Sequence, residues 1–284
     1  MVCAQTMPLP SFREVISPVA APQPPTAYPM SPSSTKGRLL AIGIHRAPPG
    51  MSKEEFLGKM KALAATVVAL PVVQKNVLKY QIISANSSFD EHIKEFGMPA
   101  STPQHIALLV AESETPEQML EISKDPELHS LVAAAEEMTP ERGASIFSAH
   151  VVEKLNKPGR DHKDNLRVVG LFKVPQHLTP AQHAEKFEAL VDSIVAHPTI
   201  QKNMLGYTMW LTNDTMNTSI QTMRIPAPER TCVLILEAEN WERAVEIAKD
   251  ADVAELVAGG HQDFGFLAES SSFSADFITM FDKK

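Results

Sequence analysis

Val73-Gln-Lys-Asn-Val-Leu-Lys-Tyr80 returns 127 positions later as Ile200-Gln-Lys-Asn-Met-Leu-Gly-Tyr207. Two further pairs follow in the same order and at nearly the same spacing. They are Glu121-Ile-Ser-Lys-Asp125 with Glu246-Ile-Ala-Lys-Asp250, and Phe147-Ser-Ala-His150 with Phe273-Ser-Ala-Asp276. Because the repeated segments keep their order, we interpret the chain as a unit of about 115 residues that was duplicated and fused.

Each copy alternates short apolar runs, typical of strands, with amphipathic runs, typical of helices. The predicted strands are residues 39–45, 77–84, 105–112, 145–152, 168–173, 204–211, 231–237 and 273–281. The predicted helices begin at capping or first-turn signals near Ser52, Thr115, Thr179 and Trp241, with the first ending at Pro71 and the last at Val257. Two long loops, residues 86–104 and 213–230, have the length of lids. Each copy is therefore predicted to be a βαββαβ unit.

One βαββαβ unit folds as a ferredoxin-like antiparallel sheet with its helices on one face. The other face of the sheet is apolar and must be covered, which two units placed face to face achieve. We predict an α+β fold in which two tandem ferredoxin-like units form one intramolecular barrel related by a pseudo-two-fold. The predicted parts are a Pro-rich disordered tail (1–36), a first unit (37–152), a linker (153–166) and a second unit (167–284).

Composition narrows the classes of function. The net charge is −8 and no basic stripe appears, which argues against nucleic acid as a partner. No apolar run approaches the length of about 20 residues that a membrane helix needs. Cys3 and Cys232 form no disulfide framework, so we expect a reducing, cytoplasmic environment.

Motifs for the common cofactors are absent from the sequence. It contains no Walker loop, dinucleotide fingerprint, HExxH, CxxC or nucleophile elbow. The ten histidines are scattered without metal-ligand spacing, so we predict neither a metal nor a cofactor. The expected partner is a small-molecule ligand or substrate, and the fused tandem is compatible with a homo-oligomer.

The layout of residues 38–284 resembles the dimeric α/β-barrel superfamily, in particular EthD-like proteins and stress-responsive Dabb-type barrels. Asp125-Pro-Glu-Leu-His129 is similar to the Pro-x-His segment of Dabb-type cyclases, with one extra residue. Gly260-His-Gln-Asp-Phe264 looks like the region before the last strand in EthD-like sequences. The resemblance implies cofactor-free chemistry on polyketides or other aromatics, in cyclases, decarboxylases and oxygenases.

Candidate site residues lie on the predicted strands. His45 shares a face with Ala41 and Gly43, whose small side chains leave room for a ligand, although an idle histidine at a strand end has the same pattern. Tyr80 and Tyr207 occupy equivalent places, either as packing or as phenols that donate a proton or bind substrate. His150 shares a face with Ser148, as Asp276 does with Ser274. Such polar pairs line a cavity or pair across the interface between the sheets.

Two further histidines lie near the ends of the second helices. The cyclase-like context makes His129 a candidate general base, and His261 follows Gly259-Gly260, where backbone is open to a ligand. His183 lies on an otherwise apolar helix face, where a core histidine is expected. Methionines cluster around the long second-half loop, as suits an adaptable pocket or an ordinary core: Met204, Met209, Met216 and Met223.

Three functions remain open. The first is a cofactor-independent lyase or cyclase of secondary metabolism that acts on an apolar oxygenated small molecule by histidine acid–base catalysis. The second is a non-catalytic binding or stress-responsive barrel, and the third is a haem-binding barrel. Because His45 aligns with Phe172 and His129 with Ala254, we expect chemistry in the first half only. His45→Ala or His129→Ala should then reduce turnover far more than His261→Ala.

Overall fold

The computed structural model describes residues 38–88, 92, 105–137, 145–158, 165–222, 230–264 and 270–283. Residues Pro32–Lys284 form one compact unit. The predicted tail, residues 1–36, and most of the predicted loop at 86–104 lie outside the described residues.

The first half follows the predicted order, with two short helices added. Its elements are β1 (Leu39–Arg46), α1 (Lys53–Ala69), α2 (Pro71–Asn76), β2 (Lys79–Ala85), β3 (Ile106–Ser113), α3 (Pro116–Ile122), α4 (Pro126–Glu137) and β4 (Ser145–Asn156). Pro71 was predicted to end a helix, and it also starts α2, because proline is well suited to a first helical position. The strand predicted to end at residue 152 continues as β4 into the predicted linker, as far as Asn156.

The second half repeats this order. Its elements are β5 (Leu166–Lys173), α5 (Pro180–Ala196), α6 (Pro198–Asn203), β6 (Met204–Asn213), α7 (Asn217–Thr222), β7 (Thr231–Ala238), α8 (Trp241–Ala248), α9 (Ala251–Phe264) and β8 (Ser270–Asp282). The single helix predicted over residues 241–257 is two helices. Asp250 separates them, and its carboxylate accepts the backbone N–H groups of Asp252 and Val253 at the start of α9. The predicted loop at 213–230 contains α7.

The strands of the described chain close into one eight-stranded barrel, in the order β1-β3-β2-β8-β5-β7-β6-β4. Within each half the order is that of the ferredoxin-like sheet. The halves then join at two edges, where β2 pairs with β8 and β4 pairs with β6. The predicted fold class is confirmed, and its two sheets are hydrogen-bonded into one closed sheet.

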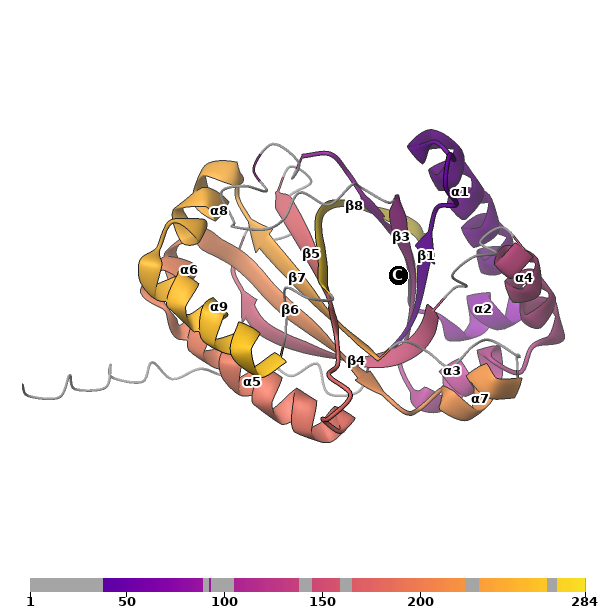
Figure 1. The fold of residues 1–284 in the computed structure, drawn as a ribbon. Helices are drawn as coiled ribbons and strands as arrows, with labels where there is room; N and C mark the ends of the chain where they lie inside the picture. Colours follow the sequence, from indigo (N-terminus) through magenta and orange to yellow (C-terminus); the bar gives the residue numbers. More distant parts are fainter. Residues whose placement is uncertain are drawn as a thin grey trace, which may run out of the picture. The chain divides into compact units, whose positions relative to one another are not determined.

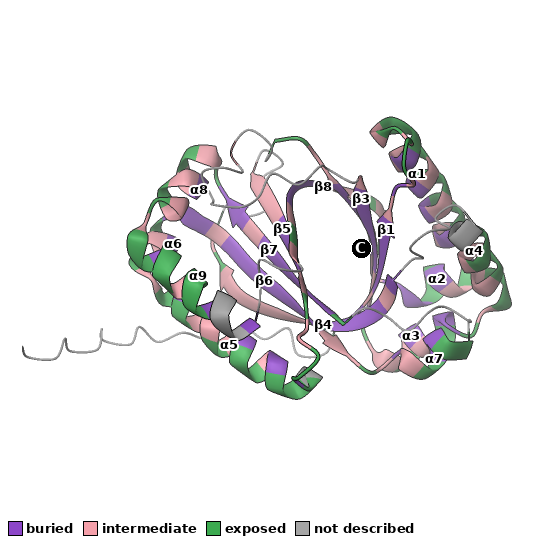
Figure 2. Cartoon of the chain, viewed as in Figure 1, coloured by how far each residue is buried: buried purple, intermediate pink, exposed green. Residues whose placement is uncertain are grey.

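Large apolar side chains from both halves fill the barrel interior. They include Ile42, Ile44, Ile83, Phe147, Val169, Trp210, Val233 and Phe273. An eight-stranded barrel is just wide enough for side chains to fill it, so this interior is a core. Figure 2 shows the buried residues along the strands and on the helix faces that turn toward them.

Helices cover the outside of the barrel (Figure 1). The first-half helices pack over the outer face of β1–β4, joined there by α7 from the second half, while α5, α6, α8 and α9 cover the outer face of the second-half strands. Two further cores therefore lie between strands and helices, one in each half.

A matching polar contact fixes each of the two junctions between the halves. The Ser148 hydroxyl on β4 donates to Asn213 Oδ1 at the end of β6, over 2.7 Å. The Ser274 hydroxyl on β8 donates to the side chain of Asn86, just after β2. The expectation that this strand face carries polar pairing between the sheets is confirmed for these two serines.

Among the residues that the structure describes, no helix has the length and apolar character needed to span a membrane.

Candidate functional site

An apolar cavity of about 110 Å³ lies in the first half, between the outer face of the sheet and the helices. The strands contribute small residues, Ala41 and Gly43 on β1 and Ala111 on β3, which leave space that the helices do not fill. The helices contribute Leu63, Val67, Met119, Ile122, Leu128 and Val132. The face that carries Ala41, Gly43 and His45 was predicted to leave room for a ligand, and the cavity lies against it.

His45 is a buried imidazole in this cavity, with 4% of its surface exposed. Its Nδ1 atom has no hydrogen-bond partner among the described residues. Burial lowers the pKa of His45 to about 4, because a charged imidazole is poorly solvated in an apolar site. The ring is therefore neutral at pH 7, with one nitrogen able to accept a hydrogen bond or a proton.

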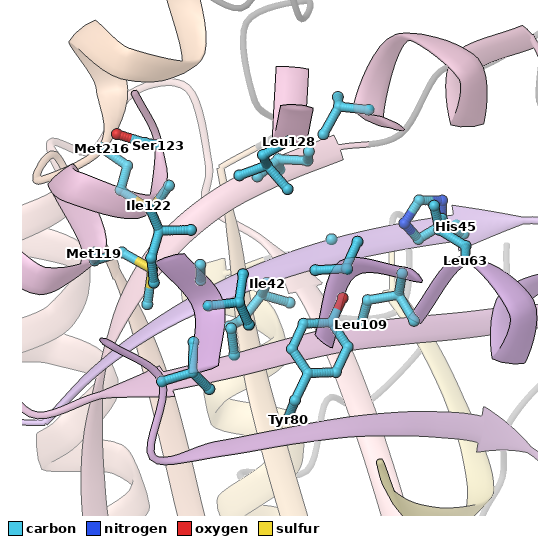
Figure 3. Close-up of a pocket in the computed structure, with 18 residues that line it drawn as sticks. Ile42, His45, Leu63, Tyr80, Leu109, Met119, Ile122, Ser123, Leu128 and Met216 are labelled. Carbon is cyan, nitrogen blue, oxygen red and sulfur yellow. The ribbon is translucent and has the colours of Figure 1, made fainter. Parts of the chain in front are cut away.

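Tyr80 extends from β2 toward the same cavity, as Figure 3 shows. The Tyr80 side chain is buried, with 6% of its surface exposed. Burial raises the pKa of the Tyr80 hydroxyl, so it remains a phenol and a hydrogen-bond donor. His45 and Tyr80 are the ionisable side chains among the described residues that line the cavity. They do not bond to each other.

The equivalent space in the second half is filled by aromatic rings. A Cβ placed on Gly43 would lie 3.1 Å from His45 Nε2, and one placed on the equivalent Gly170 would lie 2.5 Å from Phe172 Cε2. Phe172 thus lies over its strand as His45 does. Its ring packs on Phe187, with ring centroids 6.2 Å apart. The sequence alignment of His45 with Phe172 therefore corresponds to a real spatial equivalence.

His183 belongs to this second-half aromatic cluster, as expected of a core histidine. Its ring stacks on Phe187 at 5.1 Å and meets the edge of Phe264 at 5.6 Å. Burial lowers its pKa to about 4. Its Nε2 atom has no partner among the described residues, so this core histidine is buried without a hydrogen bond at that nitrogen.

His129 and His150 are placed away from the cavity. A ring nitrogen of His129 donates to the backbone carbonyl of Ser123, at 2.7 Å, across the break between α3 and α4. This bond satisfies a carbonyl at the end of α3 and explains the residue structurally. His150 lies on β4 with an exposed side chain.

The remaining predicted residues belong to the second half. Tyr207 is buried in the second-half core. Asp276 is exposed and accepts a hydrogen bond from Asn86 Nδ2 at 2.8 Å, at a surface groove shared with Arg167 and Trp241. The backbone of His261 lies in α9, and its side chain is outside the described residues. Of the seven predicted residues, the structure places two, His45 and Tyr80, in one cavity.

One group of described residues has the spacing of metal ligands. The ligand atoms of His197, Asp250 and Asp252 lie within 4.8 Å of one another. Asp250 also accepts from the start of α9 and from the Thr199 hydroxyl, and His197 Nδ1 accepts the backbone N–H of Thr199 at 3.3 Å. These bonds give the group a role in fixing helix ends.

Several cavity residues had no distinctive signal in the sequence. In the sequence, Ser123 and Met119 cannot be told apart from ordinary helix residues. Met216 was noted only as one of several methionines suited to a pocket, and it reaches the first-half cavity from the second half. Gly43 was informative, because a glycine two residues before a histidine on a strand leaves room for the histidine ring.

No family model matches the chain, and no curated protein matches its sequence. Among solved structures, an anthrone oxidase-like protein matches 88% of this chain and 96% of its own, with a TM-score of 0.56 at 10% identity. A candidate monooxygenase from Fusobacterium nucleatum matches 85% of this chain and 93% of its own, with a TM-score of 0.48 at 10% identity. A candidate monooxygenase from Lactobacillus acidophilus matches 85% and 94%, with a TM-score of 0.44 at 9% identity.

The anthrone oxidase-like structure, at this low identity, is informative about the fold. Together with the closed barrel and its internal repeat, it identifies the architecture. The chain has the fold of a dimeric α/β barrel, with the two halves joined in one polypeptide.

Proposed function

We propose that the first-half cavity is the active site of a cofactor-independent lyase or cyclase that removes a proton next to a carbonyl group. The observation that carries this proposal is that His45 and Tyr80 line one apolar cavity, where the buried Nδ1 atom of His45 has no hydrogen-bond partner among the described residues. A buried polar atom without a partner is costly, and a ligand that supplies the partner recovers that cost.

The protonation states suit this chemistry. His45 is neutral and accepts the proton from the carbon next to the carbonyl, while the electron pair of the broken C–H bond forms the C=C bond of an enolate. The Tyr80 phenol donates a hydrogen bond to the enolate oxygen. The low pKa of His45 makes it a weak base in the empty cavity. The negative charge on a bound enolate raises that pKa, because opposite charges attract strongly in an apolar site.

The size and charge of the cavity limit the substrate. A dry apolar cavity of about 150 Å³ binds benzene, so this space of about 110 Å³, which is partly open, takes a group of about one small ring. No lysine or arginine lines it among the described residues and His45 is neutral, so carboxylates and phosphates would enter without a cationic partner. The proposed substrate is therefore neutral, apolar and carries one carbonyl oxygen near His45 and Tyr80.

A passive binding protein is the second candidate. It is favoured by the missing partner at His45 Nδ1, because catalytic histidines are commonly oriented by a hydrogen bond to the second ring nitrogen. In that case the cavity holds the same class of neutral ligand and leaves it unchanged. A haem-binding barrel stays a prediction from the resemblance.

Proton exchange separates the two candidates. Cyclohexanone, a single-ring ketone, is incubated with the protein in D2O, and loss of its α-proton signals is followed by NMR. Catalysis predicts exchange above the buffer rate, reduced about 100-fold or more by His45→Gln and by Tyr80→Phe. Tyr207→Phe is the matched control, because Tyr207 occupies the equivalent second-half position and lies away from the cavity. It should leave exchange unchanged.

Binding of cyclohexanone measured by calorimetry, with exchange no faster than in buffer, would reject catalysis and favour the binding protein. Exchange that survives both His45→Gln and Tyr80→Phe would reject these residues as the acid–base pair.

A further inference from the structure

One wall of the first-half cavity comes from the second half of the chain. Met216 follows β6, precedes α7, and lines the cavity together with Met119 and Ile122 of the first half. It is 5% exposed and belongs to the first-half core. Ile220 of α7 is fully buried in the same core. The site is therefore incomplete without residues from the second copy.

The position of Met216 is fixed by the contact between the halves. The Met216 backbone N–H donates to the Ser148 hydroxyl oxygen at 3.2 Å, and that hydroxyl donates to Asn213 Oδ1 at 2.7 Å. Asn213 Oδ1 also accepts the backbone N–H of Thr215 at 3.0 Å. The two hydrogen bonds that Asn213 Oδ1 accepts, together with the burial of Ile220, hold the turn before α7 against β4. Met216 thus has a defined place in the wall.

Met216 and His45 lie at different ends of the cavity, with Tyr80 between them. In Figure 3, His45 lies with Leu63 at one end, while Met216, Ser123, Ile122 and Met119 lie together at the other. A ligand whose oxygen pairs with His45 therefore directs its far end past Tyr80 toward Met216.

We propose that Met216 determines substrate specificity by limiting how far a ligand extends from His45 and Tyr80. This inference rests on the proposed function of the cavity. The second half, whose own equivalent space is filled by Phe172 and its aromatic neighbours, acts on the first-half site by supplying its end wall.

Affinities for a series of 4-alkylcyclohexanones, from unsubstituted to pentyl, test this by calorimetry. Met216→Ala removes the Cγ, Sδ and Cε atoms, so the best-bound ligand should become about two methylene groups longer. Each methylene that is newly buried should increase affinity roughly fourfold, since burying one contributes about 0.8 kcal/mol. The gain for the longer ketone is then about 15-fold. Met216→Leu keeps most of the volume and should leave the preferred length unchanged.

Ile220→Ala is the control for loosened packing, because Ile220 belongs to the same core but does not line the cavity. The same shift of length preference in Ile220→Ala would overturn the proposal, as would an unchanged preference in Met216→Ala. Either result leaves the proposed function standing as long as the native chain accelerates α-proton exchange of cyclohexanone. Failure of every ketone to bind both the native chain and Met216→Ala would overturn the proposed function and this inference together.

Discussion

The buried histidine of the first half links stability to pH at the scale of a single residue. The pKa of His45 is about 4 in the folded chain, against about 6.5 for an ordinary histidine. Between these values the unfolded chain binds a proton and the folded chain does not, so stability falls as the pH falls from about 6.5 to 4. The loss expected from His45 between pH 7 and pH 5 is about 2 kcal/mol.

Urea unfolding of the native chain and of His45→Leu at pH 7 and pH 5 measures this contribution. The free energy of unfolding of the native chain should fall by about 2 kcal/mol more than that of the variant, since leucine does not titrate. If the free energy of unfolding fell equally in both proteins, the pKa of His45 would not be lowered in the folded chain, as expected of a solvated imidazole.

The strand face on which His45 lies was predictable. The lack of a hydrogen-bond partner for its Nδ1 atom among the described residues was not. Alternation along residues 39–45 placed Leu40, Ile42 and Ile44 on one face and His45 on the other, and the structure has this arrangement. The free Nδ1 atom depends on what β3, α1 and the neighbouring elements place around the ring. His129 illustrates the opposite case, because its motif resemblance pointed to catalysis and its ring bonds to the carbonyl of Ser123.

At the scale of elements, the two serine–asparagine contacts carry much of the specificity of barrel closure. Ser148→Ala leaves Asn213 Oδ1 and the Met216 N–H without their shared partner, and Ser274→Ala removes one of the donors to Asn86 Oδ1, which keeps the Ser88 N–H. Each substitution should cost about 1–3 kcal/mol of unfolding free energy, because buried polar groups lose their hydrogen bonds.

Thermal or urea unfolding of Ser148→Ala, Ser274→Ala and the double variant checks this expectation. The contacts lie at different junctions, so their costs should add within about 0.5 kcal/mol. Serine to alanine at exposed Ser130 of α4 is the matched control. Losses no greater than that of Ser130→Ala would show that the strand ladders alone close the barrel.

Caps explain which helices were predictable. Thr179 with Gln182 forms the predicted reciprocal capping box, and the predicted cap at Thr115 forms one with Gln118, since the signal is local. Ser52 caps α1 by accepting the Glu55 N–H, without the reciprocal bond of a capping box. The division of each second helix was missed. Asp125 and Asp250 end one helical segment and cap the next, and a hydrophobic pattern that continues across the break hides it. The helix α7 was missed because its burial against the first half depends on tertiary contacts.

At the scale of the whole molecule, the closed sheet should make the two halves unfold together. Both tryptophans, Trp210 and Trp241, lie on second-half elements, and Trp210 packs in the interior core that both halves share, so their fluorescence reports on the second half and on that core. Met60 is buried in the first-half core, and Met60→Ala should cost about 2–5 kcal/mol. If unfolding is a single transition, the fluorescence midpoint in urea should fall as far as the midpoint from circular dichroism.

A fluorescence midpoint that stays at the native value in Met60→Ala would show that the second half is stable by itself. Met209→Ala is the matched variant in the second-half core, and it should lower both midpoints in the same way.

The duplication predicted the architecture at this scale because each copy carries its own strand and cap signals. It predicted one intramolecular barrel but not which strands join the halves, because pairing between β2 and β8 depends on edges that a single unit leaves open. In the second copy, the space equivalent to the cavity is filled by Phe172, Phe187 and Phe264. The only sign of this in the sequence was that Phe172 stands where the first copy has a histidine.

The pairing of β2 with β8 also determines how long β2 lacks its partner strand while the chain is being synthesised. Gln81 and Thr279, which pair across this junction, are 198 positions apart. At ribosomal rates of about 5–20 residues per second, the edge of β2 waits roughly 10–40 seconds for its partner strand. During that interval the nascent chain displays an open strand edge, which is a template for aggregation. We therefore expect the yield of native protein to depend on chaperones that shield this edge, and on contact order more than on final stability.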